Sequence, residues 1–155
     1  NIYEDKWLNM MRGKLGLIGE HKNDKKLATD LLNWMEKNKV DYTNTFCHLM
    51  NIDTKDNIYK KKDFLNWTKE WEKRSELNNS NKEKKIKLMK KNNPLIIPRN
   101  HIVEEALAKA ENGDLDKIKD LLKVLKDPLN DQTKITKYQM PAPISNEKYQ
   151  TYCGT

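Results

Sequence analysis

The chain contains little that would interrupt a helix. Its 155 residues include five glycines and five prolines, and no proline comes before Pro94. These two residue types oppose helix interiors most strongly, so their scarcity favours helices. Hydrophobic residues recur at three- and four-residue steps through most of the chain, whereas no alternating run is long enough to predict a sheet. The sequence therefore predicts an all-α fold.

Long apolar runs are also missing. The longest hold a few residues, as at 95–97, and the mean hydropathy is −1.00. A membrane-spanning helix needs roughly 20 predominantly apolar residues, so we expect no membrane partner. A chain of 155 residues is long enough for one domain with a modest core. It opens on Asn1 inside a helical pattern, and we therefore expect a piece of a longer polypeptide.

Cysteine is scarce, with Cys47 and Cys153 the two examples. Two cysteines do not make a disulfide framework, so we expect a reducing cytoplasm. Cys153 lies two residues before the last residue, where chains usually fray, so its thiol is expected to be accessible. The residues alone leave two interpretations of this thiol open, an inert surface group or a reactive one whose reactivity depends on its thiolate fraction. Cys47 lies in an expected buried helix and is a poor partner for Cys153, although the sequence leaves that pairing open.

Complete catalytic motifs are lacking too. The sequence has no glycine-rich phosphate loop, no nucleophile elbow and no zinc-protease motif. Its histidines, His21, His48 and His101, are scattered, and no spacing of cysteine and histidine suits zinc. Cys47 and His48 are adjacent, but neighbours on a helix point about 100° apart, so they are poorly placed as nucleophile and base. We expect a core cysteine beside a surface histidine, and we assign no catalytic, cofactor-binding or metal-binding residue to this chain.

Positive charge, by contrast, is plentiful and concentrated. The formal net charge is +7, and the segment 60–91 holds 12 Lys or Arg against five Asp or Glu. We favour a solvated basic face, while a surface for nucleic acid or an acidic protein is the alternative. Trp67 and Trp71 lie four apart in this segment and could stack on bases. In a chain this short of phenylalanine, a role in the hydrophobic core is the favoured interpretation.

The hydrophobic spacing predicts helices with recognisable ends. We expect Asp24, Asp41, Asn100 and Asp114 to cap helix N-termini and Gly113 to end a helix. Pro94 and Pro98 impose an extended connection, because each also disfavours helical geometry in the residue before it. The expected helices cover residues 2–14, 24–38, 43–50, 61–77, 82–91, 100–112 and 115–126.

The last part of the chain differs from the rest. From Pro128 to Thr155 there are three prolines and no helical stripe. The sequence therefore predicts a helical domain over residues 1–127, an all-α bundle, followed by a long extended C-terminal tail over residues 128–155. Arg99 follows Pro98 at a constrained junction and could hold a carboxylate or phosphate with two parallel hydrogen bonds. A salt bridge to a neighbouring helix is the interpretation that we favour.

Several segments, in this order, resemble the C-terminal region of the selenoprotein O (SelO/YdiU) family of kinase-like protein adenylyltransferases. They are "MRGKLGL" at 11–17, "LATDLLNWM…VDYTNTF" at 27–46, "NPLIIPRNHIVEEALAKAENGD" at 93–114, then "LLKVLKDP" and the terminal "YCGT". The similarity covers most of the chain and is weakest at about residues 53–85. The proline-containing segment together with a near-terminal cysteine is the specific part of this signature.

The resemblance implies a longer bacterial, cytoplasmic parent in which a kinase-like core precedes this region. Such a core binds ATP and Mg²⁺ or Mn²⁺ and transfers AMP to Ser, Thr or Tyr hydroxyls of protein substrates. The residues of that reaction have no counterpart here, so we expect this chain alone to be inactive and to hold no cofactor. Its expected partners are the kinase-like core of the same polypeptide and the protein substrates of the parent.

The resemblance also bears on the terminal thiol. In the family a cysteine near the C-terminus is redox-active, and Cys153 matches that position, which makes it the candidate redox-regulatory residue. We further expect an exposed apolar face where the kinase-like core would dock, including Trp7 or Tyr42. The alternative function is a stand-alone basic helical module that binds nucleic acid or an acidic protein, with nucleic acid the less favoured partner.

Overall fold

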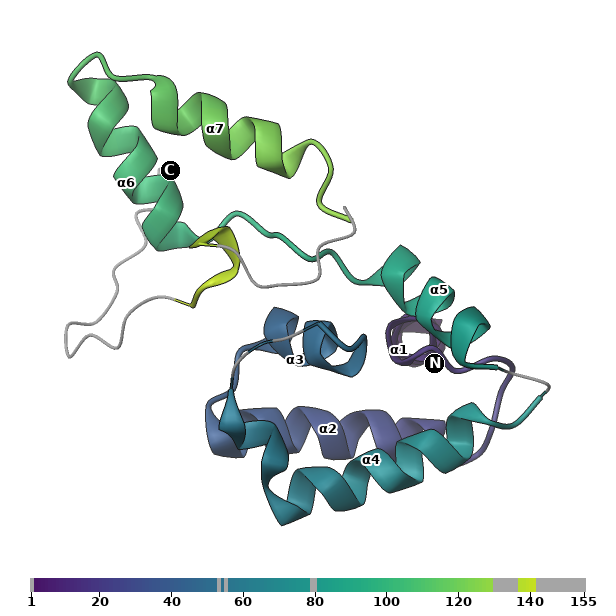
Figure 1. Cartoon of the computed structure of the whole chain (residues 1–155). Coiled ribbons are helices and arrows are strands. Elements are labelled where there is room, and N and C mark those ends of the chain that lie inside the picture. Colours follow the sequence, from purple (N-terminus) through teal and green to yellow (C-terminus); the bar gives the residue numbers. More distant parts are fainter. Residues whose placement is uncertain (1, 53, 55, 79–80, 130–136, 142–155) are drawn as a thin grey trace.

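A computed structural model shows the chain as a set of helices without a sheet in the part that it describes, residues 2–52, 54, 56–78, 81–129 and 137–141. The prediction of an all-α fold is confirmed (Figure 1). The elements are α1 (Ile2–Leu15), α2 (Asp24–Asn38), α3 (Tyr42–Leu49), η1 (Asn57–Lys60), α4 (Lys62–Ser75), α5 (Lys82–Asn92), α6 (Asn100–Glu111), α7 (Asp116–Leu125) and η2 (Lys137–Gln139), where η marks a short 3-10 helix. None of the described helices is both long enough and apolar enough to span a bilayer.

The helices form two groups joined by an extended connection. Helices α1 to α5 gather around one hydrophobic core and are called the body below, while α6 and α7 form a separate hairpin (Figure 1). Within the body, α1 packs against α2 and α5, and α2 packs against α4. The largest fully buried apolar side chains of this core are Phe46, Phe64, Met11, Leu15, Leu31, Met89 and Leu95.

The two tryptophans of α4 belong to this core. Trp67 and Trp71 are 8% and 5% exposed, and their rings stack with centroids 5.9 Å apart. The indole N–H of Trp67 donates to the Leu27 carbonyl at 3.0 Å, and that of Trp71 donates to the Leu15 carbonyl at 2.8 Å. Each tryptophan therefore ties α4 to another helix while filling the core. The core interpretation is confirmed, and these rings are not available to stack on bases.

Asp24 has a different role from the predicted helix cap. Asn23 occupies the N-cap position of α2 without a side-chain cap bond, and Asp24 lies 1% exposed between two arginines. Its carboxylate accepts hydrogen bonds from Arg12 Nε at 2.8 Å, Arg74 Nε at 2.7 Å and the His21 backbone N–H at 2.9 Å. Burial raises the pKa of Asp24, but these hydrogen bonds outweigh burial and leave the pKa below its ordinary value.

The other predicted helix ends have mixed outcomes. Asp41 caps α3 as predicted, since its side chain accepts from the Asn44 backbone N–H at 2.8 Å. Asn100 is inside α6, whose N-cap position is Arg99, and makes no cap bond there. Gly113 follows α6 with a φ of 86°, a left-handed conformation that suits glycine and ends the helix as predicted.

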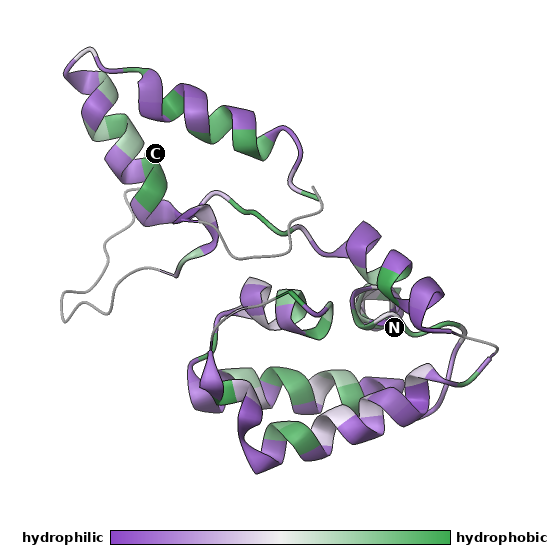
Figure 2. Cartoon of the chain, in the orientation of Figure 1, coloured by the Kyte–Doolittle hydropathy of each residue, from purple (hydrophilic) through white to green (hydrophobic). Residues whose placement is uncertain are grey.

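The α6–α7 hairpin has a much smaller apolar interior than the body. Its buried residues, within the described range 100–125, are Ala106 and Leu121, and neither belongs to the main core cluster. Figure 2 shows hydrophobic residues alternating with hydrophilic ones along both helices. Leu107 and Leu122 are 51% and 56% exposed. The hairpin thus leaves much of its apolar surface uncovered.

Candidate functional site: the anchor of the C-terminal tail

The predicted salt bridge of Arg99 is the centre of a partly buried polar cluster. Both terminal nitrogens of Arg99 donate to the Asp41 carboxylate, Nη2 at 3.0 Å from Oδ1 and Nη1 at a shorter distance from Oδ2. Asp41 is also the cap of α3, so one carboxylate holds the start of α3 and the start of α6 together. The expectation of a salt bridge to a neighbouring helix is confirmed.

The described part of the tail fastens onto this pair through Gln139. Its backbone carbonyl accepts from Arg99 Nη2 at 3.0 Å and from Asn44 Nδ2 at 3.1 Å. Its side chain is fully buried, and the amide nitrogen donates to the Leu95 carbonyl at 2.8 Å. We call Asp41, Asn44, Arg99 and Gln139 the tail anchor. They bring together α3, the start of α6 and η2, which lie far apart in the sequence.

The extended connection between α5 and α6 supplies the base of the anchor. Pro94 and Pro98 keep this segment out of helical geometry, as predicted. Its backbone is therefore free to pair with the tail, and the Leu95 N–H donates to the Pro128 carbonyl at 2.7 Å. Pro128, at the start of the tail, therefore lies against the same connection that accepts the hydrogen bond from the Gln139 side chain.

The anchor is suited to positioning and not to bond chemistry. The terminal nitrogens of Arg99 are engaged by oxygens of the chain itself, whereas its buried Nε has no hydrogen-bond partner among the described residues. Such an arginine can hold the carboxylate of Asp41 and the carbonyl of Gln139 in fixed geometry. The alternative role for Arg99, binding a phosphate, would require breaking this arrangement.

Sequence reasoning missed Gln139. The residue lies in a proline-containing segment without helical periodicity, and no motif marks a lone glutamine as buried. The one available signal is that Asn44 and Arg99 both lie inside the segments quoted above for the resemblance. The resemblance drew attention to the segments that contain Asn44 and Arg99, but nothing in it predicted that the tail would contact them.

The structure describes one of the two cysteines. Cys153 lies outside the described residues, so its role stays a prediction. Cys47 is fully buried in α3, as predicted, and burial raises the pKa of its thiol to about 11, with Asp41 adding to the shift. Little thiolate exists at neutral pH with such a pKa. Cys47 is therefore a structural residue.

His48 is partly buried, contrary to the expected surface position. Its ring stacks on Tyr59 with centroids 4.0 Å apart, and its Nδ1 lies 3.4 Å from Thr54 Oγ1. The neighbouring Cys47 makes its contacts in the main core. Tyr59 belongs to the same core cluster as Cys47, so the two side chains share these surroundings, and the absence of a catalytic pair stays a prediction.

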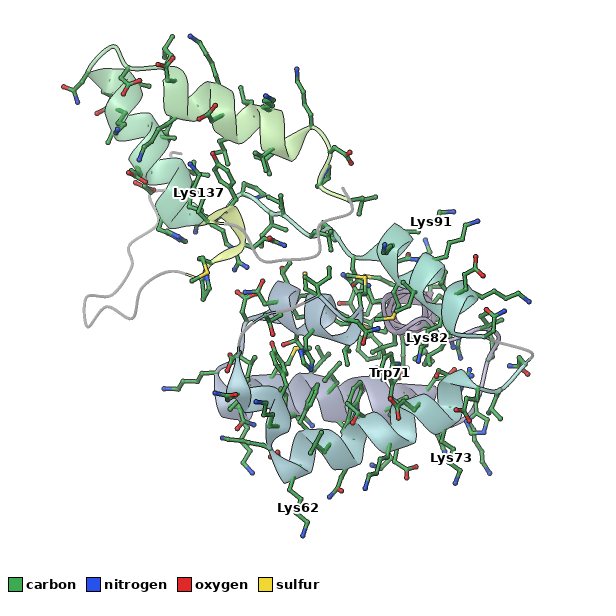
Figure 3. The ribbon with its side chains drawn as sticks, viewed as in Figure 1. Lys62, Trp71, Lys73, Lys82, Lys91 and Lys137 are labelled. Carbon is green, nitrogen blue, oxygen red and sulfur yellow. The ribbon has the colours of Figure 1, made fainter. Side chains whose placement is uncertain are left out.

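The basic segment divides into buried and outward-facing side chains. Figure 3 shows Lys62, Lys73 and Lys91 pointing away from the body, whereas Trp71 points inward. Arg74 is buried against Asp24, and Lys85 lies over the Trp71 ring at 4.3 Å. Two of the cations in this segment therefore stabilise the fold.

Over the described ranges, no group of three or more His, Cys, Asp or Glu side chains is arranged to hold an ion. The predicted nucleotide and metal of the parent are not tested by this finding.

Comparisons with known proteins agree on one family. The family model of protein adenylyltransferase SelO matches residues 1–126. The protein nucleotidyltransferase YdiU of Pelagibacter ubique strain HTCC1062 is 51% identical over 154 residues. The proteins of the same name from Nitrosococcus oceani and from Bacillus cereus strain AH820 are 41% and 42% identical over 156 residues.

The extent of these matches is as informative as their identity. In all three cases the match covers 99% of this chain but 32% of the relative. The chain therefore spans about a third of the length of the curated relatives that it matches. The match also extends to the region of the tail, beyond the residues matched by the family model.

Proposed function

Because this chain belongs to the SelO family of protein adenylyltransferases, we propose that it is the C-terminal helical part of a longer enzyme of that family. The observation that carries the proposal is that almost the whole chain matches about a third of the length of each relative. In the proposed parent, a kinase-like core outside this chain binds ATP and a divalent metal ion. It transfers AMP to hydroxyl groups of Ser, Thr or Tyr on protein substrates in the bacterial cytoplasm.

In this proposal the chain supports the kinase-like core instead of reacting with substrate. The body supplies a rigid support, because its helices are tied together by buried hydrogen bonds such as those of Trp67 and Trp71. The tail anchor fixes the position of Gln139, after which the chain continues toward Cys153. No step of AMP transfer is assigned to a residue of this chain.

The proposed regulatory residue is Cys153, and the tail anchor sets a limit on where its thiol can act. Cys153 lies 14 positions after Gln139 in the sequence. A fully extended chain spans at most about 3.6 Å per residue, so the thiol lies within about 50 Å of the anchor. Its proposed partner is a thiol of the kinase-like core, with which it would form a disulfide as an external oxidant takes up the two electrons and two protons.

An AMP-transfer experiment tests the main proposal. The full-length parent and the 155-residue chain would each be incubated with labelled ATP, Mg²⁺ and a protein extract. We expect protein-bound AMP with the parent and none with the chain alone. AMP transfer by the isolated chain would refute the proposal, as would a native gene without a kinase-like reading frame continuous with the codon for Asn1.

A thiol-labelling experiment tests the role of Cys153 separately. Brief alkylation of the native chain near neutral pH is expected to modify Cys153 and to spare Cys47, whose pKa is raised to about 11. In the full-length parent, Cys153→Ser is expected to abolish any sensitivity of AMP transfer to oxidant. Unchanged sensitivity in that variant would remove Cys153 from the mechanism, while the support role would be unaffected.

The alternative function, a basic binding module, receives less support. The tryptophans that could stack on bases are buried, and Arg74 and Lys85 have structural contacts. The outward lysines of α4 alternate with acidic residues. We expect no salt-sensitive binding of a mixed-sequence oligonucleotide at about 50 mM salt, a condition at which phosphate contacts are strong.

A further inference from the structure

Helix α7 carries more apolar surface than the hairpin covers. Leu115, Ile118, Leu122 and Leu125 recur at steps of three, four and three residues, the spacing of a helix that packs along another helix. Leu115, just before the helix, and Leu122 are 50% and 56% exposed. The buried residue of α7 is Leu121, and Ile118 and Leu125, which lie on the same side of the helix, are partly buried. Leu115 and Leu122, seven positions apart, therefore form an open stripe beside the apolar side that is used within the chain.

The open stripe is bordered by positive charge. Leu122 and Leu125 line an open depression of about 430 Å³, and the other lining residues are Lys119, Lys123 and Lys126. Lys119 also lies 3.6 Å from Asp116, a weak contact between two exposed side chains. The surface is thus apolar along its floor and basic at its rim. A partner that fits it presents apolar side chains between acidic ones.

A second copy of this chain is a poor occupant for this surface. An isologous contact would bring the same three lysines of two copies together. Each copy also has a net charge of +7, so repulsion would act over the whole molecule. The more suitable occupant is a segment of different charge.

The comparisons leave room for such a segment in the same polypeptide. The relatives extend well beyond the third of their length that this chain matches. We propose that the Leu115–Leu122 stripe of α7 is the docking site for an amphipathic helix with acidic flanks, contributed by the part of the same polypeptide that lies outside this chain. This inference rests on the proposed function, since it requires the chain to be part of a longer enzyme.

Hydrogen exchange measured on the full-length parent and on the 155-residue chain tests this contact. If a helix covers α7, its amides will exchange at least about tenfold more slowly in the parent, the factor that corresponds to 1.4 kcal/mol. Leu122→Glu in the parent is expected to return α7 to the exchange rate of the isolated chain. Leu65→Glu, at a 47% exposed leucine of α4, is the matched control and is expected to leave α7 protected.

A charge variant tests the predicted chemistry of the partner. Lys123→Glu with Lys126→Glu is expected to remove part of the protection of α7 in the parent, and added salt is expected to weaken protection in the unmodified protein. Increased protection in the double variant would contradict acidic flanks. Circular dichroism of the 155-residue chain carrying Leu122→Glu serves as the folding control, because this leucine is already exposed.

Equal exchange of α7 in the two proteins would overturn the docking site, as would protection that survives Leu122→Glu. A dimer of the isolated chain that dissociates with Leu122→Glu would assign the surface to a second copy instead. AMP transfer by the unmodified parent is measured alongside. If transfer is present and α7 is unprotected, the docking site fails while the proposed function stands.

Discussion

The body and the α6–α7 hairpin are built from helices of similar length, yet they are held together in different ways. The body surrounds a continuous core and adds buried polar links, among them the Asp24 cluster and the two tryptophan N–H groups. The hairpin has two buried side chains, Ala106 and Leu121, and several half-exposed leucines. Helical periodicity alone therefore does not distinguish a helix whose apolar face is buried within the chain from one whose apolar face stays partly exposed.

The largest effect expected from this difference is at Asp24. Asp24→Asn removes the carboxylate that Arg12 and Arg74 share; the buried Arg74 loses its ion pair, whereas Arg12 keeps its contact with Glu20 at 3.2 Å. Breaking a buried ion pair in this way costs about 3–5 kcal/mol of unfolding free energy. Urea unfolding of the 155-residue chain at neutral pH measures this loss. Asp30→Asn, at an exposed pair with Lys26 on the same helix, is the control and is expected to change stability by less than about 1 kcal/mol.

The contribution of Asp24 to the free energy of unfolding is expected to depend on pH in one direction. The pKa of Asp24 is lowered in the folded chain, so its contribution is fully present above the unfolded value of about 3.9. The contribution is lost as the pH falls through the lowered folded pKa. The stability difference between the unmodified chain and Asp24→Asn should therefore shrink in strongly acidic solution. A difference that does not change with pH would contradict the ion-pair interpretation.

The comparison between leucines of the two groups is sharper because the chemical change is the same. Leu31→Ala in α2 removes a fully buried side chain and is expected to cost about 2–5 kcal/mol. Leu122→Ala in α7 removes a side chain that is 56% exposed and is expected to change the stability of the isolated chain by about 0.5 kcal/mol or less. Similar losses for the two variants, measured by urea unfolding, would mean that the hairpin is as well packed as the body.

A smaller effect is expected where the two groups meet. Arg99→Lys keeps the charge but loses the paired hydrogen bonds to Asp41, and is expected to cost about 1–2 kcal/mol. Faster exchange of the Leu95 amide would report that the tail had loosened, since this amide donates to Pro128. Asn100→Ala, next to Arg99 and without a cap bond, should leave both measurements nearly unchanged.

Much of this architecture follows from the sequence because helices and their apolar faces are local patterns. The positions of the helices, the core role of Trp67 and Trp71 and the capping role of Asp41 are all set by residues within a few positions of one another. Asp24 was mistaken for a cap because a carboxylate at a helix start is ordinarily one. Its actual partners, Arg12 and Arg74, lie 12 and 50 residues away.

One residue of the tail anchor, Arg99, was predictable from a local pattern. The position of Arg99 after Pro98 indicated a salt bridge, and the structure identifies Asp41 as the partner. The participation of Gln139 depends on where the chain returns after α7, which no local pattern encodes. The exposed stripe of α7 could likewise not be separated from its buried side by spacing, because Leu115, Leu121 and Leu122 all fit one helical apolar pattern.

The hydrogen bond from the Gln139 side chain to Leu95 has a practical consequence for anyone who trims this protein. A version that stops before residue 137 deprives the Leu95 carbonyl of its donor and Arg99 of one of its acceptors, at the joint between the two helical groups. In such a shortened version we expect α6 and α7 to be held less firmly against the body than in the intact molecule. Deletions meant to remove the terminal thiol should therefore keep Gln139 and begin after it.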